Sequence, residues 1–218
     1  MGAKFELNCD PAIDVQKLKD DGFDYVHLAI GAWKSRDLPI EGETDKVLGA
    51  IKFLTQFTDD PSPIRLGKNV AVIGAGNSAM DAARAALRIT GVENVSIIYR
   101  RSRKEMPATR EEFLETTHDG ATFHQLVNPL SLHDGILKCQ QMKLGDKDDS
   151  GRRRPVPVEG EFVEFEIDTV ITAIGELVEY ELLEGNQLVA DENGDIPVNE
   201  YHETNVENVY LGGDAYRG

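Results

Sequence analysis

Lys68-Asn69-Val70-Ala71-Val72-Ile73-Gly74-Ala75-Gly76-Asn77-Ser78-Ala79-Met80-Asp81 is the stretch that decides the fold of this chain. A short run of apolar residues leads into two glycines and then into a helical pattern, which predicts a buried strand that turns directly into a helix. The spacing G-x-G-x-x-A is typical of a dinucleotide pocket. Gly74 would permit the sharp turn, Gly76 would let the backbone approach a pyrophosphate, and Ala79 would keep the helix close to the sheet.

A second predicted strand, at 94–99, ends in Arg100-Arg101-Ser102-Arg103-Lys104. At this place an NAD-specific pocket would carry an acidic residue that binds the ribose hydroxyl. Four cations among five residues favour a 2′-phosphate, so we predict that Arg100 and Arg101 bind NADP(H). A solvated strand end would show the same charges, although a cationic run is conspicuous in an acidic chain. The last two cations of the run fit solvent exposure better.

The composition is that of a globular chain long enough to bury a core. Among its 218 residues, 39 Asp and Glu stand against 23 Lys and Arg, which gives a formal net charge of −16. Such a charge repels nucleic acid and anionic membranes, so we expect neither as a partner. No apolar run of membrane-spanning length and no signal peptide stands out, which predicts a cytoplasmic protein.

Cysteine and histidine spacing gives no sign of a metal site. Cys9 and Cys139 form no C-x-x-C pair, which argues against a redox dithiol, a zinc ribbon or an iron–sulfur cluster held by this chain. The five histidines show neither H-x-x-H nor H-E-x-x-H spacing. We therefore expect no bound metal.

Hydrophobic periodicity predicts strands and helices on both sides of the glycine turn. Residues 59–63 fit neither the helical nor the strand period of apolar residues, which predicts a domain boundary there. Thr109 and Glu112 predict a capping box at the start of a helix. An exposed hairpin is expected around 146–155. The other predicted helices lie at 12–19, 45–57 and 77–89, and the predicted strands at 4–7, 25–30, 69–73, 95–99, 121–127, 136–144 (paired with 161–167), 168–174, 196–198 and 209–211.

Three further predicted strands end in glycine-containing motifs. Together with the glycine turn, these motifs resemble those of the two-dinucleotide-domain flavoprotein reductases. Within these, the chain is most similar to the glutamate synthase small-subunit-like group, which includes selenate reductase subunits. The resemblance covers nearly the whole chain. Its motifs are Leu28-Ala29-Ile30-Gly31-Ala32-Trp33-Lys34, Tyr99-Arg100-Arg101 with Glu105-Met106-Pro107-Ala108, Gly151-Arg152-Arg153-Arg154-Pro155, Thr172-Ala173-Ile174-Gly175, Asn205-Val206-Glu207-Asn208-Val209 and Val209-Tyr210-Leu211-Gly212-Gly213-Asp214.

The resemblance implies an α/β fold in which a three-layer, Rossmann-like NAD(P)-binding domain is inserted in the remnant of an FAD-binding domain. We therefore expect an FAD-domain segment and linker at 1–63, an NADP(H)-binding domain at 64–174 and a C-terminal FAD-domain segment at 175–218. The family begins its FAD domain with a separate glycine-rich βαβ unit, which the residues before Lys4 do not supply. We expect a piece of a longer protein that binds FAD poorly by itself.

The resemblance also implies cofactor contacts. Asp81 would lie near the nicotinamide, although the helix dipole alone also favours an acid in the first turn. Asn77 would cap the helix or touch phosphate. Gly213 and Asp214 would meet the flavin. The full candidate set for cofactor binding is Gly74, Gly76, Asn77, Ser78, Ala79, Asp81, Arg100, Arg101, Gly175, Gly213 and Asp214.

From these expectations we predict an NADPH-dependent oxidoreductase domain that delivers hydride to FAD in the parent protein. Hydride transfer requires no general acid, so no catalytic residue is assigned. Electrons would leave through iron–sulfur centres on other domains or subunits, toward glutamate synthesis, selenate reduction or another acceptor. The isolated chain is expected to be inactive. Two alternatives stay open: a non-catalytic NADP(H)-binding or scaffold module, and an S-adenosylmethionine-dependent transferase, which usually has an acid where Arg100 stands.

Overall fold

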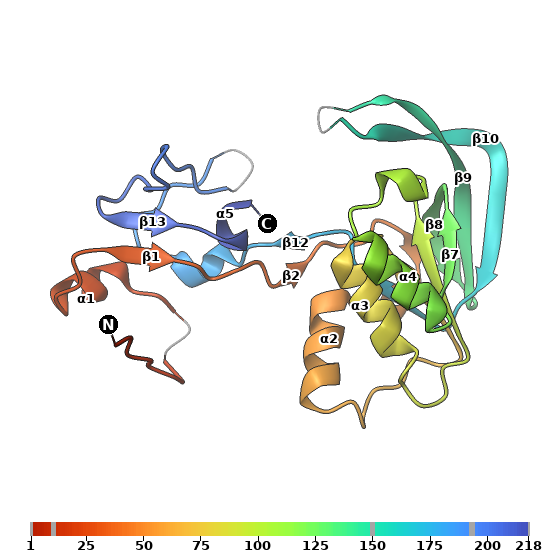
Figure 1. Ribbon diagram of the computed structural model, residues 1–218, viewed down its shortest axis with the longest axis horizontal. Coiled ribbons are helices and arrows are strands. Elements are labelled where there is room, and N and C mark those ends of the chain that lie inside the picture. The colour runs from red at the N-terminus through yellow and green to blue at the C-terminus, as the bar shows by residue number, and fades with distance from the viewer. Residues whose placement is uncertain (1, 10–11, 149–150, 192–194, 218) are drawn as a thin grey trace. The chain divides into compact units, whose positions relative to one another are not determined.

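The computed structural model describes residues 2–9, 12–148, 151–191 and 195–217, and within them the chain forms two compact units (Figure 1). The larger unit is Ser35–Gly175. The smaller one combines Met1–Lys34 with Glu176–Gly218. The strands β2 (Lys34–Ser35) and β12 (Glu176–Leu177) pair where the chain passes from one unit to the other. The larger unit is therefore an insertion within the sequence of the smaller one.

A parallel sheet forms the middle of the larger unit. Its strands lie in the order β4, β11, β5, β6 and β7 along the described residues, and each pair of neighbours is parallel. Both faces of β5 and β11 are covered, which explains why their sequences are almost continuously apolar. The strands are β4 (Val47–Gly49), β5 (Asn69–Ile73), β6 (Asn94–Tyr99), β7 (Thr122–Gln125) and β11 (Thr169–Thr172).

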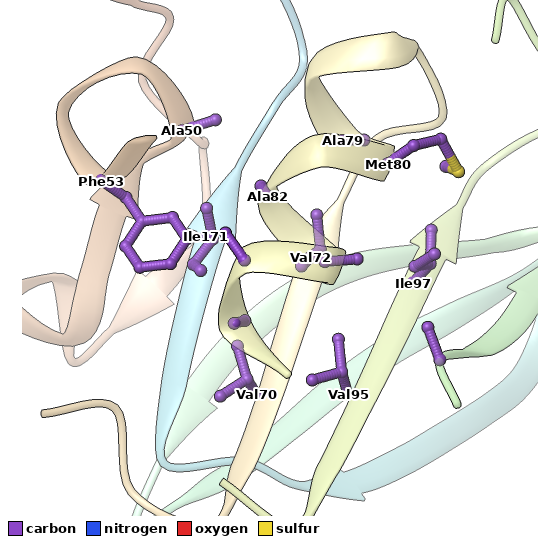
Figure 2. Packing of buried hydrophobic residues seen from close by; sticks show 14 of the residues in the cluster. Ala50, Phe53, Val70, Val72, Ala79, Met80, Ala82, Val95, Ile97 and Ile171 are labelled. Atoms are coloured by element: carbon purple, nitrogen blue, oxygen red, sulfur yellow. The ribbon is translucent and has the colours of Figure 1, made fainter. Parts of the chain in front are cut away.

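Three helices of the described chain pack on one face of this sheet: α2 (Ala50–Asp59), α3 (Asn77–Ala86) and α4 (Arg110–His118). Alanines on the buried side of α3 let it approach β5 closely. Figure 2 shows Phe53 of α2 directed at Ile171 of β11, with Val72 of β5 under α3. The predicted strand, glycine turn, helix and strand at 69–99 are thus confirmed.

The opposite face is covered by a second sheet instead of helices. Along the described residues its order is β10 (Arg153–Glu166), β9 (Ile136–Lys147), β8 (Val127–His133) and β3 (Glu41–Gly42). Leu132, Leu137 and Cys139 pack there against Ile98 and Val170 of the parallel sheet. The predicted pairing of 136–144 with 161–167 is confirmed by the antiparallel register of β9 and β10. Residues 149–150 of the predicted hairpin lie outside the described residues.

The smaller unit has its own core. Strands β1 (Val26–Leu28) and β13 (Val209–Leu211) pair in parallel, and α1 (Val15–Asp20) and α5 (Asp214–Arg217) belong to the same unit. Buried Asn186 joins its two chain segments, because its Oδ1 accepts from the Val15 N–H at 2.7 Å and its Nδ2 donates to the Ile13 carbonyl at 2.6 Å. The unit thus depends on contacts between residues far apart in sequence.

Several sequence expectations are wrong at this level. Residues 4–7 and 196–198 form no strand, and the helix predicted at 45–57 begins only at Ala50, because Val47–Gly49 pairs with β11 as strand β4. Strand β8 was not predicted. The boundary predicted at 59–63 does not separate the two units, since Phe53 shares one core with Val70 on the other side of it. In the described parts of the chain, no helix is long and apolar enough to cross a membrane.

The two cysteines differ sharply in environment, which gives a test of the fold. Burial raises the pKa of the Cys139 thiol to about 12, whereas Cys9 is exposed. The thiolate is the reactive form, so at pH 8 iodoacetamide is expected to label Cys9 alone in the native chain and both cysteines in denaturant. Mass spectrometry of the labelled peptides measures this. Rapid native labelling of Cys139 would contradict the packing of the second sheet against the first.

Candidate functional site

The turn after β5 requires glycine at Gly74. Its φ of +133° is one that residues with a side chain rarely adopt. A Cβ at this position would also overlap the carbonyl oxygen of Ala173, directly after β11. The turn is therefore pressed against the end of the neighbouring strand, as the sequence predicted for a sharp turn.

Gly76 is different, because nothing in the protein requires glycine there. Its φ of −86° suits any residue, and a Cβ built on it would meet no atom within 4 Å. The residue directly precedes α3, so the missing side chain leaves open space in front of the helix start. Such space is what a pyrophosphate needs when it approaches the backbone. The residues present therefore fit a dinucleotide phosphate.

At the start of α3 the Ala79 and Met80 N–H groups donate to the Gly76 carbonyl, and among the described residues the Asn77 and Ser78 N–H groups have no partner. No side chain caps this helix end, and Gly76 is its N-cap residue. The first N–H groups of a helix have no partner within the helix, and together with the helix dipole they favour an anion. Ser78 is half-buried in this first turn, and Ala79 is fully buried in the core as predicted.

Asn77 joins the starts of two helices. Its Oδ1 accepts from the Thr109 N–H at 3.2 Å, and the Ala108 N–H donates to the Ala75 carbonyl at 3.0 Å. Thr109 caps α4 by accepting from the Glu112 N–H at 3.2 Å. The predicted capping box is thus half formed. In a complete box the Thr109 N–H would donate to the Glu112 carboxylate, but here it donates to Asn77 instead. The prediction that Asn77 caps its own helix is therefore wrong, because no side chain caps α3, and the predicted contact of Asn77 with a phosphate stays a prediction.

Arg100 and Arg101, at the end of β6, have opposite environments. The Arg100 side chain is exposed and has no hydrogen bond or ion pair among the described residues. Arg101 is only 8% exposed: its Nε donates to the Arg153 carbonyl at 2.9 Å and its Nη2 to Asp148 Oδ2 at 2.8 Å. The Arg100 side chain is therefore fully available to a ligand from solution, whereas Arg101 could offer only the N–H donors that these contacts leave over.

The remaining cations of the run lie beyond this point. The Arg103 guanidinium lies 4.3 Å from the centroid of the Phe113 ring, and Lys104 is exposed. The Tyr99 hydroxyl donates to the Glu105 carbonyl at 2.9 Å and so closes the loop between β6 and α4. Arg103 and Lys104 are both exposed, as expected, and the assignment of the coenzyme site to the first two arginines stays a prediction.

The parallel sheet brings most predicted site residues to one edge. The glycine turn follows β5, the arginines follow β6, and Gly175, with φ +117°, follows β11, so all lie at carboxyl ends of neighbouring strands. Asp81 is exposed on α3 and has no partner among the described residues. Gly213, with φ +64°, and Asp214 belong to the smaller unit and are both exposed.

Asp148 is the site residue that sequence reasoning missed. It lies 47 positions after Arg101, and no local pattern connects the two. Only the pairing of β9 with β10 brings it to the end of β6. The predicted 136–167 hairpin located the element, but nothing in the sequence indicates which acid of its tip meets an arginine.

Curated relatives match the chain along its whole length. YgfK of Escherichia coli O157:H7 is 44% identical over 218 residues, which are 100% of this chain and 21% of that protein. The NADP(+)-dependent formate dehydrogenase subunit beta of Moorella thermoacetica is 40% identical over 229 residues, 100% of this chain and 32% of that protein. The glutamate synthase [NADPH] small chain of E. coli K12 is 32% identical, over 100% of this chain and 51% of that protein. The chain thus spans about a fifth to a half of these relatives.

Solved structures show the same fold. Mycobacterium tuberculosis FprA in complex with NADPH matches 95% of this chain and 61% of its own with a TM-score of 0.76 and 21% identity. Thioredoxin reductase of T. acidophilum matches 88% of this chain and 57% of its own with a TM-score of 0.64 and 22% identity. The α/β fold with a parallel sheet is therefore confirmed.

A family model covers nearly all of the sequence. The model described as pyridine nucleotide-disulphide oxidoreductase matches residues 3–218, and members of this family bind FAD and NADP. Gly74 and Gly76 supply the glycine turn that this chemistry needs, and the open space at Gly76 fits a coenzyme phosphate. The chain belongs to the pyridine nucleotide-disulphide oxidoreductase family.

Proposed function

We propose that this chain is the NADP(H)-binding part of an NADPH-dependent flavoprotein oxidoreductase that passes hydride to FAD in its full-length protein. The observation that carries the proposal is the open space in front of Gly76, at a helix start with no side-chain cap. A glycine that the fold does not need is explained by a ligand phosphate. The FprA structure with NADPH supports the fold that such a site requires.

The strand order indicates in which direction the coenzyme would lie across the ends of the strands. Its pyrophosphate would bind at the α3 start, and Arg100 and Arg101, at the end of β6, would bind the adenosine 2′-phosphate. The nicotinamide would then extend to the other side of the turn, toward Gly175 at the end of β11. Asp81 is proposed on the same nicotinamide side. The protein's task is to place and desolvate the nicotinamide, because hydride transfer depends on position.

Gly213 and Asp214 are proposed FAD contacts of the full-length protein. Both are exposed in the smaller unit, and a Cβ at Gly213 would meet no atom within 4 Å. FAD, when bound, accepts hydride and can release electrons singly. This chain's residues hold and orient the donor, and we propose that the FAD domain is completed by other parts of the protein.

Electron acceptors are proposed from chemistry and from the names of relatives. With only two cysteines, far apart in sequence, the chain cannot supply the thiolate ligands that a cluster needs. We propose that electrons leave through iron–sulfur centres on other domains or subunits. Relatives named formate dehydrogenase subunit beta and glutamate synthase small chain support a subunit role. Glutamate synthesis or selenate reduction as the final reaction stays a prediction.

Calorimetry of the isolated chain tests the proposal. NADPH is expected to bind at least about tenfold tighter than NADH, since one charge-assisted contact to the 2′-phosphate contributes roughly 1.5 to 3 kcal/mol. S-adenosylmethionine is expected not to bind. Tighter binding of S-adenosylmethionine, or no nucleotide binding, would reject the proposal. Reduction of a dye by NADPH and the full-length protein separates the enzyme from a scaffold module.

A further inference from the structure

Arg101 is held on one edge of its guanidinium. Nε donates to the Arg153 carbonyl at 2.9 Å and Nη2 donates to Asp148 Oδ2 at 2.8 Å, and the guanidinium also forms a hydrogen bond with the Tyr99 side chain. The side chains are only 10% and 19% exposed in this ion pair. An arginine carries five N–H donors in a rigid fork, so fixing one edge also fixes the direction of the other.

The hairpin holds Asp148 just as firmly. Asp148 directly follows β9, and its Oδ1 accepts from the Arg152 N–H at 3.2 Å while its own N–H donates to the Arg152 carbonyl at 2.7 Å. The backbone of the arginine is tied to the same sheet, because the Leu126 N–H donates to the Arg101 carbonyl at 3.1 Å. The carboxylate is therefore oriented before any ligand arrives.

We propose that Asp148 is a positioning residue for coenzyme selection. It holds the Arg101 guanidinium so that Nη1 faces the 2′-phosphate, beside the exposed Arg100. A pre-organised arginine loses less conformational entropy on binding than a free one. This inference rests on the proposed function, and it assigns the preference for NADPH to a residue of the β9–β10 hairpin as well as to the arginines after β6.

The negative charge of Asp148 by itself predicts the opposite change in NADPH affinity, so an experiment can distinguish the two roles. A carboxylate near a phosphate repels it, so a purely electrostatic role means that removing the Asp148 charge strengthens NADPH binding. Positioning means that the same change weakens it. The direction of the change in affinity therefore separates the two roles.

The experiment compares Asp148→Asn with wild type by calorimetry of the chain with NADPH, adenosine 2′,5′-bisphosphate and NADH. The two ligands with a 2′-phosphate are expected to bind about tenfold more weakly, and NADH equally well. Asp148→Glu should restore part of the loss. Asp146→Asn is the matched control, since it removes the same charge from an exposed residue two positions earlier, near the end of β9. This variant should change the affinity for each of the three ligands by less than about twofold.

A second measurement covers the case in which Asp148→Asn does not fold. In crystals of the wild-type chain soaked with adenosine 2′,5′-bisphosphate, Arg101 should keep its Nη2 contact with Asp148 while Nη1 contacts the phosphate. An arginine that leaves Asp148, or does not reach the phosphate, overturns the proposal, as do unchanged or tighter NADPH affinities in Asp148→Asn. A wild-type chain without preference for NADPH would instead reject the proposed function, and this inference with it.

Discussion

Replacing Gly76 with valine is expected to weaken NADPH binding about a hundredfold or more while the fold stays intact. The side chain would project into the open space where the pyrophosphate approaches, because no protein atom lies within 4 Å of a Cβ there. Displacing the pyrophosphate removes at least two charge-assisted hydrogen bonds, each worth roughly 1.5 to 3 kcal/mol. Calorimetry with NADPH measures the loss.

The stability of the same variant is the necessary control. Gly76 has φ −86°, which valine also adopts, so the free energy of unfolding should change by less than about 1 kcal/mol. Gly74→Ala is the opposite case, because its φ of +133° and the Ala173 carbonyl both exclude a side chain. That variant should lose about 3 kcal/mol or more of stability. Equal thermal melting of the two variants, or undiminished NADPH affinity in Gly76→Val, would refute this division of roles.

The part of the fold that local signals determine was predictable from sequence. The strand at 69–73, the turn at Gly74 and the helix start at Asn77 all rest on neighbouring residues, and the structure has them at these positions. The Thr109 cap of α4 was predictable for the same reason. The central residues of the candidate site lie at this strand end and helix start, so they were predictable from the same local signals.

Long-range pairing explains what sequence reasoning missed. Residues 47–49 follow a helical period, yet they form β4 because β11 offers them a parallel partner more than a hundred residues later. The second sheet covers a face where helices would be usual, since Leu132 and Leu137 reach that face only through the β8–β9 pairing. The Arg101–Asp148 ion pair depends on the same sheet. Such contacts leave no mark in a short window of sequence.

The structure also changes how the two arginines after β6 can be tested. Removing Arg101 would leave the half-buried Asp148 carboxylate without its guanidinium, so a loss of affinity would be mixed with a loss of stability. Arg100 has no such partner among the described residues, and its removal changes the ligand contact alone. Arg100 is therefore the residue on which coenzyme preference is best measured.

Arg100→Ala is expected to lower the affinity for NADPH tenfold to a hundredfold and to leave NADH binding unchanged. One charge-assisted hydrogen bond to phosphate accounts for roughly 1.5 to 3 kcal/mol, and NADH has no phosphate at that position. The preference for NADPH over NADH should therefore fall by the same factor, and the dependence of NADPH binding on salt should become weaker. Calorimetry of both coenzymes at two salt concentrations measures these effects.

Lys104→Ala is the matched control, because it removes one positive charge from an exposed side chain of the same loop. A general attraction between a cationic loop and an anionic coenzyme would make the two variants lose affinity alike, for NADH as well as for NADPH. A direct contact makes the loss specific to Arg100 and to the ligand that carries the 2′-phosphate. Equal losses in both variants would show that the loop acts only through its net charge, and the assignment of Arg100 would then be wrong.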